Sequence, residues 1–107
     1  MQAERTLMGV EFRFSGTLST GLVIHKNVNI RISPDAIKII QSEIQEKSPV
    51  LMGACRDNPP DKSIGKALMN NGYSPQFSSY VVPLLIADGF CIANEQRPFV
   101  ITKRAKT

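Results

Sequence analysis

The segment that most constrains the fold of this 107-residue chain is residues 74–90, SPQFSSYVVPLLIADGF. Its Ser-Pro start is typical of a helix, because serine caps free backbone N–H groups and proline at the first helical position loses no hydrogen bond. Gly89 ends the helix, since glycine adopts the left-handed conformation at low cost. The segment therefore predicts a helix near residues 75–87. Its buried side recurs at spacings of four and three residues: Ser78, Val82 and Leu85.

Two further helices are expected before this segment. The first, near residues 34–47, opens with a serine cap, a proline and an acidic residue, and it ends at Ser48-Pro49. The second, near residues 63–71, contains Gly65, which allows close packing, and it is joined to the third helix by the turn Gly72-Tyr73. Apolar stripes at helical spacing predict the buried side of each helix. The core residues expected from the three stripes are Ile37, Ile40, Ile44, Leu68, Val82 and Leu85.

A β-hairpin is expected after the third helix. The apolar runs 90–93 and 99–102 flank turn residues at 94–98. Residues 50–52 lie between the first two helices and predict a short strand, with a few more helical residues as the alternative.

Residues 7–32 predict an N-terminal antiparallel β element. Apolar and polar residues alternate around Phe12 and again around Ile30, which is the two-residue period of a strand with one buried face. Ser15-Gly16 and residues 19–21 have the composition of turns. A hairpin or a three-stranded meander is favoured, and one long second strand is the alternative. The alternating apolar residues are Val10, Phe12, Phe14, Val28, Ile30 and Ile32.

Two helices on a short glycine turn, followed by a strand pair, resemble the winged helix-turn-helix family. The resemblance rests on Ser74-Pro75, Val82, Leu85 and Gly89-Phe90, and it covers roughly the last two-thirds of the chain. It implies an α+β fold with three helices, a C-terminal hairpin called the wing, and an extra N-terminal antiparallel β element. The predicted organisation is one domain, 1–107, with the β element at 7–32, the winged-helix part at 34–102 and a basic tail at 103–107.

The resemblance also implies that the chain binds double-stranded DNA and acts as a transcriptional regulator. The third helix would lie in the major groove, where the amide of Gln76 would read adenine. Ser79 and Tyr80 would contact a base or a phosphate, and cations would bind the phosphates. The predicted DNA-binding residues are Lys62, Lys66, Gln76, Ser79, Tyr80, Arg97, Lys103 and Arg104.

The outward face expected for the third helix departs from the family pattern. It holds no arginine or lysine, whereas phosphate neutralisation supplies much of the affinity of most such complexes. Phe77, Tyr80 and Pro83 give this face an aromatic, partly apolar character, and exposed aromatic residues often anchor protein interfaces. The alternative function is therefore a non-catalytic protein–protein interaction module that uses the Phe77/Tyr80 face. A further alternative places both rings in the core or in a dimer contact.

No motif in the sequence nominates an enzyme or a cofactor site. There is no glycine-rich phosphate loop and no nucleophile elbow, so we predict a protein that is not an enzyme and holds no cofactor. Cys55 and Cys91 belong to no Cys-x-x-Cys pair, and His25 is the only histidine. We therefore expect no metal site, two free thiols, and a histidine at an edge or turn.

The remaining expectations concern compartment and assembly. The net charge of +4 favours approach to a polyanion. No apolar run approaches the roughly 20 residues that span a bilayer, and no signal-like block follows the N-terminus, so we predict a cytoplasmic protein with no membrane contact. A homodimer is expected, formed through the N-terminal β element or the Phe77/Tyr80 face.

Overall fold

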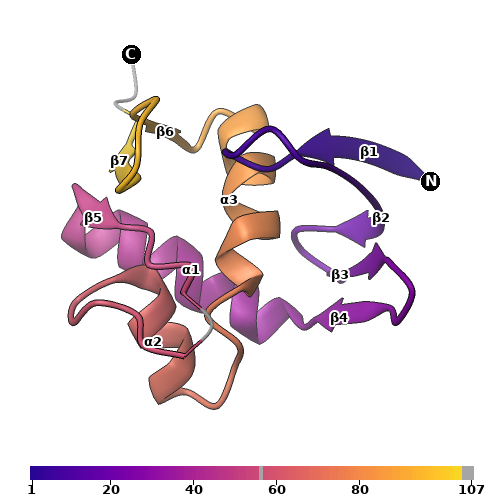
Figure 1. The fold of residues 1–107 in the computed structure, drawn as a ribbon, viewed down its shortest axis with the longest axis horizontal. Helices are drawn as coiled ribbons and strands as arrows, with labels where there is room; N and C mark the ends of the chain where they lie inside the picture. Colours follow the sequence, from indigo (N-terminus) through magenta and orange to yellow (C-terminus); the bar gives the residue numbers. More distant parts are fainter. Residues whose placement is uncertain (56, 105–107) are drawn as a thin grey trace.

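A computed structural model describes residues 1–55 and 57–104 of the chain as an α+β domain with three helices and antiparallel sheets. The first sheet is N-terminal, and its four strands pair in chain order, each antiparallel to the next (Figure 1). Its strands are β1 (Gln2–Arg5), β2 (Glu11–Thr17), β3 (Gly21–His25) and β4 (Ile30–Ile32).

The alternation of β2 and β3 explains why this sheet has one buried face. Phe12 and Phe14 are buried while their neighbours Glu11 and Arg13 are exposed. Phe14 lies opposite the buried Ile24, so apolar side chains of neighbouring strands meet on the same face. That face turns toward the helices.

The N-terminal sheet differs from its prediction in three ways. It is a four-stranded meander, because the polar N-terminus forms β1, which has no apolar alternation that could have signalled it. Ser15 and Gly16 lie inside β2 and do not form a turn, since both keep partners on β3. Val10 and Val28 lie outside the strands and are 63% and 80% exposed, so both strands are shorter than the alternation predicts.

The rest of the chain is a helix, a short strand, two helices and a hairpin. The second sheet has the order β5-β7-β6, with both pairs antiparallel, so the strand between the first two helices lies beside the last strand of the chain. The short-strand prediction for residues 50–52 is confirmed. The elements are α1 (Pro34–Lys47), β5 (Val50–Leu51), α2 (Ile64–Asn70), α3 (Phe77–Ala87), β6 (Cys91–Ala93) and β7 (Val100–Lys103).

Local capping sets the boundaries of these helices. The Oγ atoms of Ser33 and Ser63 accept hydrogen bonds from backbone N–H groups of the first turns of α1 and α2. Gly89 ends α3 at a φ of 82°, as predicted. The start of α3 is two residues later than predicted, because residues 74–76 form a tighter turn in which Phe77 donates to the carbonyl of Ser74.

Gly65 allows α2 to touch the segment that follows β5. Its N–H donates to the carbonyl of Met52 at 2.9 Å. A Cβ atom at this position would lie 1.8 Å from the carbonyl oxygen of Gly53, so only glycine fits there without a shift of the backbone. The expected close packing at Gly65 is confirmed.

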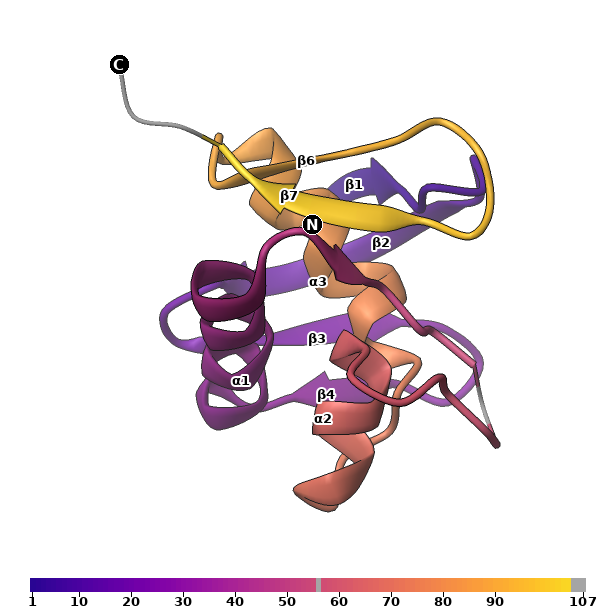
Figure 2. The same ribbon diagram turned by 90° about the vertical axis from the view of Figure 1, so that its left-hand side faces the viewer.

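The core predicted from the helical stripes is confirmed. All six of its residues are fully buried, and Phe12 joins them from the first sheet, whereas Ile30 is only partly buried. The helix α3 lies between the N-terminal sheet on one side and α1 and α2 on the other, as Figures 1 and 2 show from two directions. This central position decides which parts of α3 a partner can reach.

Candidate functional site

The helix α3 is buried in its middle, whereas its first turn is partly exposed and its last residue, Ala87, is exposed. Its buried residues lie on several sides of the helix, and it carries no charged side chain between its first and last residue. A helix that is apolar all round is a buried helix. Pro83 is expected on an outward face but is buried; that expectation is wrong, because α3 lies between the N-terminal sheet and the helices α1 and α2. The buried set comprises Ser78, Val81, Val82, Pro83, Leu84 and Leu85.

The two aromatic residues of the first turn are partly buried. Phe77 packs against Tyr73, with ring centroids 6.3 Å apart. Tyr80 packs edge-to-face on Phe12 of β2 at 5.2 Å, which ties the first turn to the N-terminal sheet. Both rings therefore rest against the core, in line with the plainest of the alternatives drawn from the sequence.

Lys26 joins this turn from the loop between β3 and β4. Its Nζ donates to the hydroxyl of Tyr80 at 3.0 Å and lies 5.6 Å from the centre of the ring. No local sequence pattern places Lys26 there, since the two residues are 54 positions apart. The contact adds a cation beside the first turn of α3.

A groove of about 800 Å³ opens beside the first turn. Its walls come from four parts of the chain: the β1–β2 loop, β5 with the residues after it, the first turn of α3, and the tip of the β6–β7 hairpin. Most of the lining is apolar, and Arg97 is the only charged residue among the described residues that line it. The lining residues are Thr6, Leu7, Met8, Val10, Leu51, Met52, Gly53, Ala54, Cys55, Pro60, Ser79, Tyr80, Arg97, Pro98 and Phe99.

Three of the predicted DNA-binding residues meet in this groove: Ser79, Tyr80 and Arg97. Gln76 stands just before α3 and is exposed. The structure thus brings the first turn of α3 and the hairpin tip to one face of the molecule.

The other four predicted residues lie elsewhere. Lys62 is exposed just before α2, and Lys66 is partly exposed in the first turn of that helix. Lys103 and Arg104 lie at the far end of the hairpin from its tip, as Figure 2 shows for the two ends of β7. The Nζ of Lys103 lies 5.3 Å from the ring centre of Phe90. Positions 105–107 of the predicted basic tail lie outside the described residues.

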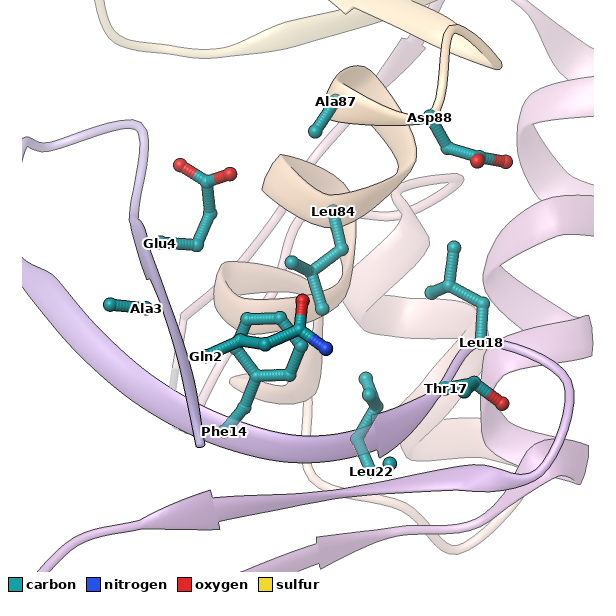
Figure 3. Close-up of a pocket in the computed structure, with 11 residues that line it drawn as sticks. Gln2, Ala3, Glu4, Phe14, Thr17, Leu18, Leu22, Leu84, Ala87 and Asp88 are labelled. Carbon is teal, nitrogen blue, oxygen red and sulfur yellow. The ribbon is translucent and has the colours of Figure 1, made fainter.

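A smaller hollow of about 330 Å³ lies between β1, the β2–β3 turn and the last turns of α3. Figure 3 shows Leu84 and Phe14 pointing into it, with the carboxylates of Glu4 and Asp88 on opposite sides. None of the predicted functional residues lines this hollow.

The single histidine and the two cysteines have ordinary surroundings. The Nε2 of His25 is 2.9 Å from the hydroxyl of Ser15 on the neighbouring strand. Both thiols are free, as predicted: Cys55 is exposed in the groove, and burial raises the pKa of the Cys91 thiol to about 11. Within residues 1–55 and 57–104, no cluster of three or more His, Cys, Asp or Glu side chains is arranged to hold a metal ion.

Among the described residues, no helix has the length and apolar character needed to cross a membrane. Comparison of the chain with protein-family models, with curated proteins and with solved structures found no match.

Proposed function

We propose that this chain is a winged-helix DNA-binding protein that regulates transcription and has no catalytic activity. The support begins with the element order α1-β5-α2-α3-β6-β7 and with β5 placed beside β7. The sequence resemblance to winged helix-turn-helix proteins implies the same order. In such a domain α3 is the second helix of the helix-turn-helix, and the β6–β7 hairpin is the wing.

The observation that carries the proposal is the common face of α3 and the hairpin tip. Ser79 and Tyr80 share one groove with Arg97, and Gln76 is exposed beside them. In helix-turn-helix proteins the N-terminal residues of the second helix contact base edges, whereas cations contact phosphates. Because the middle of α3 is buried and its first turn shares a groove with Arg97, the duplex meets this helix at its N-terminal end.

The proposed contacts divide into two classes. The amide of Gln76 reads a base edge in the major groove, and the hydroxyls of Ser79 and Tyr80 bind a base or a phosphate. The cations bind phosphates and supply most of the affinity, and Lys26 joins them through its position on Tyr80. The phosphate-binding class comprises Lys26, Lys62, Lys66, Arg97, Lys103 and Arg104.

The test is a titration of the full chain with a mixed-sequence duplex at about 50 and 200 mM salt. We expect measurable affinity at the lower concentration and a steep negative dependence on salt. Gln76→Ala should weaken preference at one base position by about 1–3 kcal/mol. Arg97→Ala should weaken binding to all sequences alike and lower the salt slope by about one.

Arg31→Ala is the matched control, because it removes the same charge from an exposed position on β4 of the N-terminal sheet. It should leave the affinity and the slope nearly unchanged. Absence of duplex binding at low salt would overturn the proposal, as would an Arg31 effect equal to that of Arg97.

The alternative, protein interaction through the face bearing Phe77 and Tyr80, has less support. Phe77 and Tyr80 are partly buried against Tyr73 and Phe12, so neither ring stands free as an interface anchor. A protein partner would have to use the apolar wall of the groove.

We also propose a homodimer, since helix-turn-helix proteins that read two half-sites do so as symmetric pairs. The N-terminal sheet supports this proposal because β1 and β4 are its outer strands, and each leaves one edge open to pairing with another chain. Sedimentation equilibrium at micromolar concentration checks it. A monomer throughout that range contradicts the homodimer, but it does not contradict DNA binding, which the titration tests separately.

A further inference from the structure

The apolar wall of the groove beside the first turn of α3 takes no part in the proposed DNA contacts. A duplex presents phosphates and polar base edges, whereas the groove wall is formed mainly by leucine, methionine, valine, proline and phenylalanine side chains. Met8 and Val10 on its wall are 60% and 63% exposed. The groove therefore has a capacity for apolar material that the proposed DNA contacts leave unused.

Its size suits a small molecule. A volume of about 800 Å³ falls within the range of about 300–1,000 Å³ that is usual for small-molecule sites. Such sites are mostly apolar, with a few polar groups that fix the orientation of the ligand. The polar side chains here are the hydroxyls of Thr6, Ser79 and Tyr80, the thiol of Cys55 and the guanidinium of Arg97.

These polar groups favour an anion. An arginine side chain is a cation, and its planar guanidinium matches the geometry of a carboxylate. Within residues 1–55 and 57–104 the only ion pair is Lys47–Glu43, so Arg97 retains its capacity to bind an anion. The hydroxyl of Tyr80 accepts from Lys26, which leaves its own hydrogen available for a ligand oxygen.

We propose that the groove binds a small amphipathic organic anion, an apolar chain or ring system that carries one carboxylate or sulfonate. The apolar body lies against Leu7, Met8, Val10, Leu51 and Phe99, and the anionic group binds Arg97 with help from the hydroxyl of Tyr80. The binding itself is independent of the function proposed above. One consequence rests on that function: the ligand and the duplex use Ser79, Tyr80 and Arg97, so they exclude one another.

The experiment uses the full chain and dodecanoate below its micellar concentration as the probe. Binding is followed by displacement of the fluorescent sulfonate 1-anilinonaphthalene-8-sulfonate and by amide chemical shifts. We expect saturable binding, with shifts at Met8, Val10, Ala54 and Phe99. Residues around the smaller hollow, such as Glu4 and Leu18, should not shift.

Arg97→Gln should weaken dodecanoate about tenfold, the loss expected for one charge-assisted hydrogen bond, and should leave the neutral analogue dodecanol unchanged. Arg31→Gln removes the same charge from an exposed position on β4 that does not line the groove, and it should have no effect on either ligand. Absence of saturable binding up to millimolar dodecanoate would overturn the proposal, as would shifts confined to the smaller hollow or equal effects of the two arginine variants.

Competition with duplex DNA then separates the two proposals. Dodecanoate that binds the chain and displaces the duplex supports both. If dodecanoate binds but no duplex does, the ligand site stands and the DNA-binding function fails. If a duplex binds and dodecanoate does not, the DNA-binding function stands and the ligand site fails.

Discussion

The helices α1 and α3 are of similar length but are built in different ways. α1 buries one stripe, Ala36, Ile37, Ile40 and Ile44, and its other side carries charged residues, among them the 3.1 Å Lys47–Glu43 pair. α3 buries six residues from Ser78 to Leu85 and has neighbours on several sides. An amphipathic helix such as α1 has one neighbouring layer, whereas α3 lies between two layers. Consequently α1 exposes a whole face, whereas α3 is exposed only at its two ends, the first turn and Ala87.

The largest expected effect tests the burial of α3. Leu85→Ala should lower the free energy of unfolding by about 2–5 kcal/mol, because the residue is fully enclosed and a cavity would remain. Gln45→Ala on the exposed side of α1 is the control and should change it by less than about 0.5 kcal/mol. Urea titration measures both. An unchanged midpoint for Leu85→Ala would mean that α3 is not the central element described here.

The next test extends the comparison to α2, which touches neighbouring backbone at one point. Gly65→Ala should destabilise the protein by about 1–3 kcal/mol, since the new Cβ would overlap the carbonyl of Gly53. This loss should exceed the gain in helix propensity, about 1 kcal/mol for glycine to alanine. Lys66→Ala, one residue later and partly exposed, is the control. A Gly65→Ala protein as stable as the control would show that the segment after β5 moves freely away from α2.

Much of this architecture could be predicted from the sequence because its signals are local. Ser33-Pro34 and Gly89 mark helix ends by their own backbone chemistry, and the stripe of α1 follows from one buried side. The strand β1 could not be found, since Gln2–Arg5 has no alternation of its own and pairs only through β2. The end of β2 could not be predicted for the same reason. Gly16 has the composition of a turn and is a strand residue only because it pairs with β3.

The candidate site was predicted in part. Gln76, Ser79 and Tyr80 follow from the position of the helix, but the groove is made by segments far apart in the sequence, such as Met8, Ala54 and Phe99. No local pattern brings those together. One sequence signal does predict the burial of α3. Residues 74–87 contain no charged residue, which favours a helix that is buried on all sides over a helix with an outward face. That reading would have placed Pro83 in the core.

A smaller effect concerns Cys91, which follows α3 on β6. Its pKa is raised from 9.0 to about 11 by burial, so the folded protein holds this proton more tightly than the unfolded chain does. The stability that it contributes is complete below pH 9 and is lost as the pH rises from 9 to 11. By pH 10 the loss should be about 1 kcal/mol.

Cys91→Ala is the control for this pH dependence. It should be less stable at neutral pH because of the cavity, but its stability should fall less steeply between pH 9 and 11 than that of the natural protein. Parallel curves for the two proteins would show that the thiol on β6 is not enclosed. In that case β6 would be packed less closely against the core than the structure shows.

The smallest expected effect tests the accessible first turn of α3. Tyr80→Phe removes the hydroxyl that accepts from Lys26 at 3.0 Å and keeps the ring that packs on Phe12. Because the Lys26–Tyr80 bond is exposed, its loss should cost less than about 1 kcal/mol of stability. If the same change weakens duplex binding, Lys26→Ala should weaken it too. The loss of binding free energy in the double variant should not exceed the sum of the losses in the two single variants. A Tyr80→Phe protein destabilised by more than about 2 kcal/mol would place this turn in the core, and the contrast between the first turn and the buried middle of α3 would disappear.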